Sequence, residues 1–231
     1  MAAPLKPVIC LTHADFYVVE KPPGASMHAQ HGATSFVQQC SAAFDEPLWP
    51  VHRLDQDTSG LLILARSAKA AAYFGELFAE RQIDKYYLAI GTGKPTKKQG
   101  LIEGWMSPSR GGNWRLSRTP KTTPKEHHSR TQFFSFGLPT PGWRGYILKP
   151  LSGRTHQLRV HLKALGSPIL GDSRYGTEPA ERLFLHACAL VFHYQQQLYQ
   201  CQVWPAVPPW FPTTTSELTL SAPWQLSWPR V

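Results

Sequence analysis

Acidic and basic side chains crowd the start of an apolar run in the N-terminal half of the chain. His52, Arg53 and Asp55 come just before the turn 56–60, and the apolar run 61–65 follows it. Carboxylate, guanidinium and imidazole groups are those that carry charge and protons in catalysis. A buried strand needs only the apolar run. The polar groups therefore require a separate explanation, and we look for chemistry here first.

A second basic cluster accompanies a predicted helix in the C-terminal half. Thr155 is placed to cap a helix over 155–165, which Gly166 ends. Arg159 lies at the border of the apolar stripe of this helix, where an arginine usually has a carboxylate partner. Arg154 lies just before the helix, where free backbone N–H groups favour an anion. The alternative for both arginines is ordinary surface basicity.

Two further side chains allow more than one interpretation. Lys21 stands on the stiff turn made by Pro22, Pro23 and Gly24, and it is either a solvated lysine or a phosphate contact. Tyr87 lies in a predicted strand, and by spacing alone it is a core aromatic with its hydroxyl group at the edge.

Hydrophobic periodicity predicts alternating strands and short amphipathic helices. The expected helices are 34–44, capped by Thr34 or Ser35, then 67–82, capped by Ser67, and 155–165. The expected strands are 8–11, 16–19, 61–65, 83–90, 101–105, 114–116, 131–136, 145–150, 183–192 and 197–203.

The composition indicates a folded, basic protein. The chain has 231 residues and a formal net charge of +9, which favours a polyanionic partner, nucleic acid first. We expect a single domain over 1–231. An apolar membrane span and a signal peptide are both missing from the sequence, so we expect a cytoplasmic location.

Four cysteines are spread along the chain without a C-x-x-C pair: Cys10, Cys40, Cys188 and Cys201. This spacing argues against a zinc site and against a disulfide framework. We expect them to be reduced and half-buried.

The segment 91–130 is rich in glycine, proline, lysine and arginine, and it contains Trp105 and Trp114. A positive run is usually a solvated face. Interleaved aromatic groups change that expectation, because looped RNA combines phosphates with bases that stack. The segment is a candidate RNA contact.

Several motifs in this order resemble those of the RluA-type pseudouridine synthases. They are Val18-Val19-x-Lys21-Pro22-x-Gly24, His52-Arg53-Leu54-Asp55 with Thr58-Ser59-Gly60, Lys85-x-Tyr87-x-Ala89, the run 153–161 (GRTHQLRVH), Gly171-Asp172 with Tyr175-Gly176, and Leu185-His186-Ala187. The resemblance covers about 8–204, with Ser152 where the family most often has threonine. It leaves a tail, 205–231, rich in proline and tryptophan, and it includes no S4-like domain before the catalytic part.

The resemblance implies an α+β fold with a mixed, mostly antiparallel central sheet flanked by helices and loops. It also implies isomerisation of uridine to pseudouridine in structured RNA, such as a ribosomal or transfer RNA stem-loop. The family uses no metal and no organic cofactor, and the resemblance suggests a monomer without an obligatory protein partner or membrane attachment.

Residue roles follow from the same resemblance. Asp55 matches the essential aspartate, Tyr87 the aromatic that stacks on the target base, and Arg159 the basic partner of the aspartate. Arg53, Arg154 and Lys21 would contact phosphates or position loops. A guanidinium near Asp55 would keep the carboxylate ionised, and a tyrosine ring offers the flipped uracil a flat face.

Two other classes of protein compete with an isomerase. One is a catalytically silent RNA-binding protein with the same fold. The other is a carboxylate-based hydrolase, in which Asp57 or Asp172 would be the second carboxylate. A nuclease would more often show clustered acids for metal.

Overall fold

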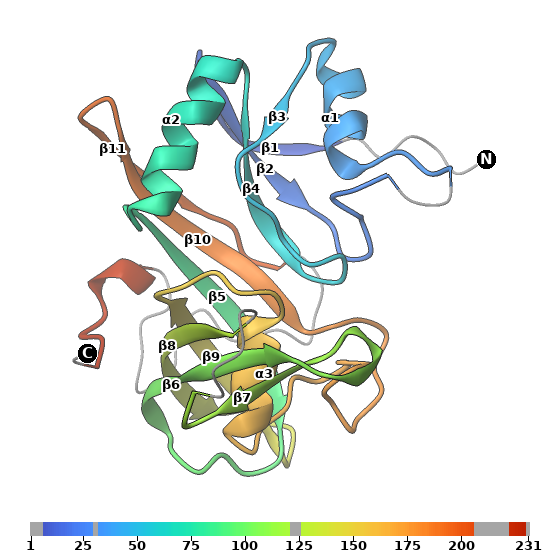
Figure 1. Ribbon diagram of the computed structural model, residues 1–231, viewed down its shortest axis with the longest axis vertical. Helices are drawn as coiled ribbons and strands as arrows, with labels where there is room; N and C mark the ends of the chain where they lie inside the picture. Colours follow the sequence, from blue (N-terminus) through green and yellow to red (C-terminus); the bar gives the residue numbers. More distant parts are fainter. Residues whose placement is uncertain (1–6, 30–31, 121–125, 206–221, 230–231) are drawn as a thin grey trace. The chain divides into compact units, whose positions relative to one another are not determined.

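The computed structural model describes residues 7–29, 32–120, 126–205 and 222–229 (Figure 1). The chain divides into two compact units. Unit 1 comprises Met1–Asp84 and Ala187–Pro205, and unit 2 comprises Lys85–His186 and Ala206–Val231. The expectation of a single catalytic domain over 1–231 stays a prediction, and each unit is described by itself.

Unit 1 is built on strands around β4, whose seven residues are all buried. A run of apolar residues with no polar alternation is typical of a strand covered on both faces, as predicted for 61–65. In this unit β1 pairs with β2, β2 and β3 pair with β4, and β10 pairs with β11, all antiparallel. The bounds are β1 Val8–Thr12, β2 Phe16–Lys21, β3 Trp49–Pro50, β4 Ser59–Ala65, β10 Leu185–Tyr194 and β11 Gln197–Gln202.

Two helices accompany these strands. Helix α1 (Phe36–Phe44) begins with a capping box in which Ser35 and Gln38 satisfy each other's backbone N–H groups. Helix α2 (Ala68–Ala79) is capped by the Ser67 side chain, as predicted, but ends at residue 79 rather than 82. Its residue Phe74 packs with the strand residues in the core of the unit.

Gly60 allows β4 to pass very close to β10. Its φ is +112°, and a β-carbon here would stand 2.3 Å from the backbone oxygen of Ala187. We expect Gly60→Ala to lower the free energy of unfolding by about 2–3 kcal/mol, because both the backbone and the neighbouring strand would be strained. Urea unfolding of the two proteins measures this, with Gly75→Ala as the control, since a β-carbon at Gly75 meets nothing within 4 Å. Equal midpoints for Gly60→Ala and wild type would contradict the prediction.

Unit 2 contains an antiparallel array with the strand order β5-β9-β8-β6-β7. Together with the helices, this gives the expected α+β fold. The prediction of short strands at 101–105 and 114–116 is wrong for the first, because β6 runs for ten residues and pairs with both β7 and β8. The bounds are β5 Ile83–Thr92, β6 Gln99–Pro108, β7 Trp114–Ser117, β8 His127–Gly137 and β9 Trp143–Pro150.

Helix α3 (Gln157–Ala164) lies against β6, β7 and β8. The predicted cap, Thr155, is wrong. The N-cap is His156 in the left-handed conformation, with φ 57° and no side-chain cap bond. The loop is held instead by Gln157, whose side chain accepts hydrogen bonds from Ser152 Oγ and the Arg154 backbone N–H.

His161 is a buried histidine with a defined proton position. Ser129 Oγ donates to the Gly104 carbonyl at 3.1 Å, so it accepts from His161 Nε2 at 2.8 Å. Nε2 therefore carries the proton, and the buried Nδ1 has no hydrogen-bond partner among the described residues. Burial, helped by the charge of His128, lowers the pKa of His161 to about 3 from its ordinary value of 6.5.

This low pKa makes the stability of the protein depend on pH. The contribution is fully present above pH 6.5 and is lost as the pH falls toward 3, because only the unfolded chain takes up the proton in this window. We expect the unfolding free energy of wild type to fall with decreasing pH more steeply than that of His161→Gln, by up to about 1.4 kcal/mol per pH unit. Urea unfolding between pH 7 and 4 measures the two slopes, and parallel slopes would contradict the prediction.

The cysteines are all free, and Cys40, Cys188 and Cys201 are buried whereas Cys10 is exposed. The expectation of half-buried cysteines is therefore wrong at each position. Burial raises the pKa of Cys201 to about 11, which makes its thiol unreactive at neutral pH. In the described parts of the chain, every helix is too short or too polar to cross a membrane.

Candidate active site

The loop that carries Asp55 is fixed by backbone hydrogen bonds within unit 1. The Asp55 carbonyl accepts from the Thr58 N–H at 3.1 Å, and the Gln56 carbonyl accepts from the Gly24 N–H at 2.9 Å. Thr58 is buried, whereas Asp55 is partly exposed. The main chain of the turn is therefore anchored while the Asp55 side chain keeps access to solvent.

Lys21 binds backbone carbonyl groups of the same turn and of the turn that follows β2. Its side chain is fully buried, and Nζ donates to the carbonyls of Pro22, Ala25 and Gln56 at 2.8–2.9 Å. The interpretation of Lys21 as a solvated lysine is wrong, and a direct phosphate contact would require the ammonium group to leave these three carbonyls. Its role in the structure is to join the Pro-Pro-Gly turn to the residue after Asp55.

The buried position of Lys21 also changes the pKa of its ammonium group. Burial lowers the pKa of its ammonium group to about 8, against the opposing charges of Asp57 and Asp55. The two carboxylates are thus close enough to the ammonium group to stabilise its charged form.

His52 and Arg53 are neighbours in sequence but have different surroundings. His52 Nε2 accepts a hydrogen bond from the Ile63 N–H at 2.9 Å, and its ring lies 4.8 Å from that of Phe78. His52 therefore connects the loop to β4 and α2. Arg53 is exposed, which leaves the predicted phosphate contact open to it.

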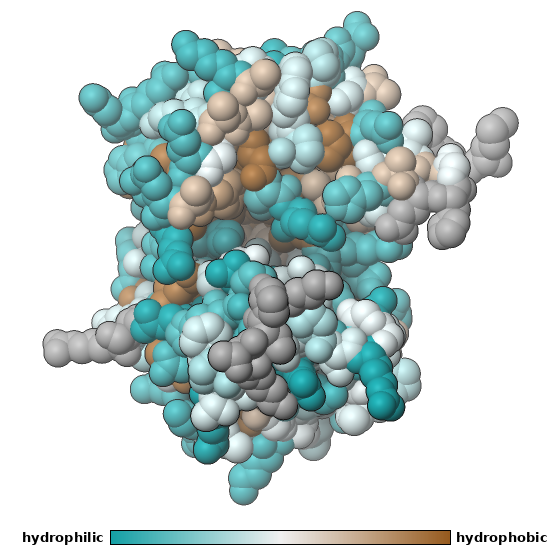
Figure 2. Space-filling model, viewed as in Figure 1, coloured by the Kyte–Doolittle hydropathy of each residue, from teal (hydrophilic) through white to brown (hydrophobic). Residues whose placement is uncertain are grey.

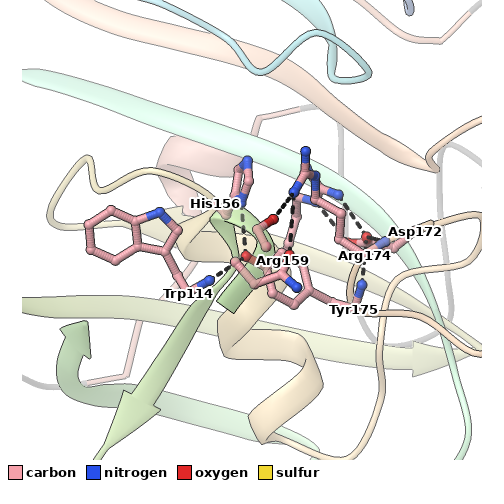
Figure 3. Close-up of polar contacts among 8 residues, drawn as sticks. Trp114, His156, Arg159, Asp172, Arg174 and Tyr175 are labelled. Carbon is pink, nitrogen blue, oxygen red and sulfur yellow. Dashed lines mark hydrogen bonds and ion pairs between the residues drawn. The ribbon is translucent and has the colours of Figure 1, made fainter. Parts of the chain in front are cut away.

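Arg159 in unit 2 forms a buried ion pair with Asp172 (Figure 3). Its Nε and Nη2 donate to the two carboxylate oxygens at 2.8 and 2.7 Å. The expected carboxylate partner of Arg159 thus exists, and it is Asp172. Burial alone would raise the pKa of Asp172, but the hydrogen bonds and charge of Arg159, with the backbone N–H groups of Arg174 and Tyr175, outweigh burial and lower it.

A tyrosine beneath this ion pair links it to the start of α3. The Arg159 guanidinium lies 5.2 Å from the centre of the Tyr175 ring, close enough for a cation–π contact. The Tyr175 hydroxyl accepts from the Trp114 N–H and lies 2.8 Å from His156 Nδ1, as Figure 3 shows. Sequence reasoning missed the roles of Tyr175 and His156, although both lie in the quoted motifs.

Tyr87 is on the same face of the unit 2 strands as α3. It stands opposite Leu148, which in turn stands opposite Phe133. Phe133 shares its face of β8 with Ser129, the contact of His161 in α3. Tyr87 is half-buried rather than a core residue, so part of its ring is available to a ligand.

The β5 motif Lys85-x-Tyr87-x-Ala89 and the run 153–161 also approach one another at residues other than Tyr87 and Arg159. Lys85 Nζ lies 3.5 Å from the point where a β-carbon would stand on Gly153. Arg154 is half-buried and its Nε donates to the His128 carbonyl at 3.4 Å. The structure therefore gathers the β5 motif and the motif that precedes α3 into one region. Asp55 belongs to unit 1, and its meeting with Tyr87 and Arg159 stays a prediction.

The exposed surface of unit 2 is basic in its described part. Exposed acids are Glu103, Glu178 and Glu181, whereas the exposed bases are Lys94, Lys97, Lys98, Arg110, Arg115, Arg118, Lys163 and Arg174. Figure 2 shows mostly white and teal residues around the β6–β7 hairpin. Trp114 is half-buried against Met106, Val160 and Tyr175. This surface has the charge that RNA phosphates require.

Sequence comparison identifies relatives of this chain that are named RNA pseudouridine synthases. The family model described as RNA pseudouridylate synthase matches residues 15–164. A Haemophilus influenzae protein named uncharacterized RNA pseudouridine synthase is 46% identical over 185 residues, covering 79% of this chain and 80% of that protein. One of Zymomonas mobilis is 35% identical and covers 77% and 83%.

Solved structures agree on the fold. Human RNA pseudouridylate synthase domain containing 1 superposes with a TM-score of 0.79 at 26% identity, covering 97% of each chain. Human RNA pseudouridylate synthase domain containing 4 gives 0.72 at 24% identity, covering 86% and 89%, which supports the fold alone. The chain belongs to the RNA pseudouridylate synthase family. Members of this family are isomerases, and this chain is therefore an RNA pseudouridine synthase.

Proposed function

We propose that Asp55 is the catalytic carboxylate with which this chain isomerises uridine in structured RNA. The observation that carries the proposal is a half-exposed carboxylate on a loop whose backbone is held at Asp55 and Gln56. A positioned acid that remains in contact with solvent is able to reach a nucleotide. In the reaction the bond between N1 and the sugar breaks, the base rotates, and a bond between C5 and the sugar forms, while the C5 proton is released to solvent and N1 takes up a proton.

The remaining residues complete this proposal. Tyr87 stacks on the flipped uracil with its exposed ring face, and Arg159 supplies the positive charge that keeps Asp55 ionised. Because Arg159 is already paired with Asp172, we propose that it serves both carboxylates, with Asp172 fixing its orientation. Arg53 and Arg154 contact phosphates.

We further propose ribosomal RNA of the large subunit as the substrate. A Rickettsia bellii protein named ribosomal large subunit pseudouridine synthase C is 35% identical over 149 residues, covering 61% of this chain and 48% of that protein. The basic surface of unit 2 fits any structured RNA, so transfer RNA is the competing substrate. The proposal includes a cytoplasmic monomer that needs no protein partner.

The test supplies purified protein with ribosomal and transfer RNA transcripts whose uridines carry tritium at C5. Release of tritium from the ribosomal transcript, in the presence of a chelator, is the expected result. Release from transfer RNA alone would overturn the proposed substrate, and RNA binding without release from either would support the silent RNA-binding alternative. Mapping pseudouridines in cellular RNA with and without the gene then identifies the position.

A further inference from the structure

The C-terminal segment 222–229 packs on unit 2, on the face of the strands opposite to α3. Gln132 of β8 donates its side-chain N–H to the Pro229 carbonyl. The Trp228 ring lies 5.2 Å from the Phe134 ring and 5.7 Å from the Tyr86 ring. In Figure 1 this red segment lies beside β8.

Trp228 joins strands that are not neighbours. The strand order is β5-β9-β8, so contacts to Tyr86 of β5 and Phe134 of β8 span the width of β9. Trp228 is itself fixed, because its Nε1 donates to the Pro223 carbonyl at 2.9 Å. The indole ring is therefore oriented by a hydrogen bond within its own segment.

The contact to Tyr86 falls where the β5–β9 ladder stops. The last pair of that ladder is Tyr87 with Leu148, and Tyr86 lies one residue beyond it. Hydrogen-bonded ladders open most easily at their ends. Tyr86 is also held by packing: it is 1% exposed, and Lys149 Nζ lies 5.4 Å from its ring centre on the neighbouring strand.

Adjacent residues of a strand point to opposite faces. Holding Tyr86 on one face therefore fixes the backbone from which Tyr87 projects on the other. We propose that Trp228 is a positioning residue, which acts through Tyr86 to hold Tyr87 in place for stacking on the target base. This inference rests on the proposed role of Tyr87 and assigns a function to the tail, whose residues Trp210 and Phe211 lie outside the described part.

The experiment compares Trp228→Ala, Trp228→Phe and wild type in the full chain, with Trp224→Ala as the matched control in the same segment. Amide hydrogen exchange reports on the peptide 83–92 and, as reference, on β4 in unit 1. We expect Trp228→Ala to speed exchange in 83–92 about tenfold, a change of about 1.4 kcal/mol in local opening, while β4 and the Trp224→Ala protein stay unchanged.

Kinetics on the RNA substrate supply the second readout. We expect kcat of Trp228→Ala to fall about tenfold with KM within about twofold, because a displaced ring impairs the chemical step, and Trp228→Phe to restore most of it. A raised KM with unchanged kcat would make the segment an RNA contact and overturn the proposal. Faster exchange in β4 as well would make Trp228 a residue of global stability and also overturn it. If wild type forms no pseudouridine, the proposed function fails, while the exchange data still decide whether Trp228 holds β5.

Discussion

Asp55→Asn is expected to lower the rate of pseudouridine formation by at least about a thousandfold, because an amide is neither a base nor a nucleophile at neutral pH. The substitution preserves the shape of the side chain. It also leaves the Asp55 carbonyl free to accept from the Thr58 N–H, and the Gln56 carbonyl free to accept from Lys21. The loss would therefore belong to the carboxylate and not to the loop. Tritium release from C5-labelled RNA measures the rate.

Asp57→Asn is the matched control for this prediction. Asp57 is exposed in the same turn, and like Asp55 it acts on the charge of Lys21. We expect its activity to stay within about threefold of wild type, since an exposed charge contributes little. RNA binding should be unchanged in both variants. Equal activity of Asp55→Asn and wild type would remove Asp55 from the mechanism, and a large loss in Asp57→Asn would revive a site with two carboxylates.

Elements with a strong local signal could be predicted from the sequence. The apolar run of β4 and the Ser35 and Ser67 caps each depend on neighbours within a few residues. The length of β6 could not be predicted in this way. Its residues include Gly100 and Gly104, which weaken a strand by themselves, and it is β7 and β8 that pair with it over its full course.

The residues of the candidate site also divide into those with a local signal in the sequence and those without one. The need of Arg159 for a carboxylate follows from its place beside a buried stripe, but the sequence does not tell Asp55 from Asp172 as the partner. That choice depends on how the loop after α3 returns to the helix. Lys21 is a clearer case, since one of its three carbonyl partners, Gln56, is 35 residues away along the chain. Burial of a lysine by distant carbonyls leaves no pattern in the sequence around it.

Asp172→Asn is expected to be the most destabilising of the side-chain substitutions at the site, by about 3–5 kcal/mol, since it leaves the Arg159 charge buried and uncompensated. The side chains are only 4% and 0% exposed. Asparagine keeps an oxygen for the N–H groups of Arg174 and Tyr175, which now share Asp172 Oδ1 with Arg159. Its amide nitrogen, however, would face Arg159 Nε, donor against donor. Urea unfolding at neutral pH measures the loss.

The dependence on pH gives a second check of the same variant. The pKa of Asp172 is lowered in the folded protein, so its contribution is present above the ordinary value of 3.8 and is lost as the pH falls through the lowered value. The difference between wild type and Asp172→Asn should therefore be constant near neutral pH and shrink in acid. A surface pair provides the control. Arg130 and Glu103 are 3.6 Å apart with 32% and 53% of their side chains exposed, and Glu103→Gln should cost less than about 1 kcal/mol.

A double variant separates the structural role of the ion pair from its role in the reaction. In Arg159→Met with Asp172→Asn, no buried charge remains and the asparagine keeps an oxygen for the N–H groups of Arg174 and Tyr175, so the cost of leaving one charge buried and uncompensated is removed. We expect most of the unfolding free energy lost in Asp172→Asn to return. Pseudouridine formation should nevertheless stay at least about a hundredfold below wild type, because the guanidinium that we assign to Asp55 is gone. Recovery of activity together with stability would show that the pair only supports the fold. Loss of activity in a stable protein would mean that the Arg159 guanidinium serves the reaction and not only the fold.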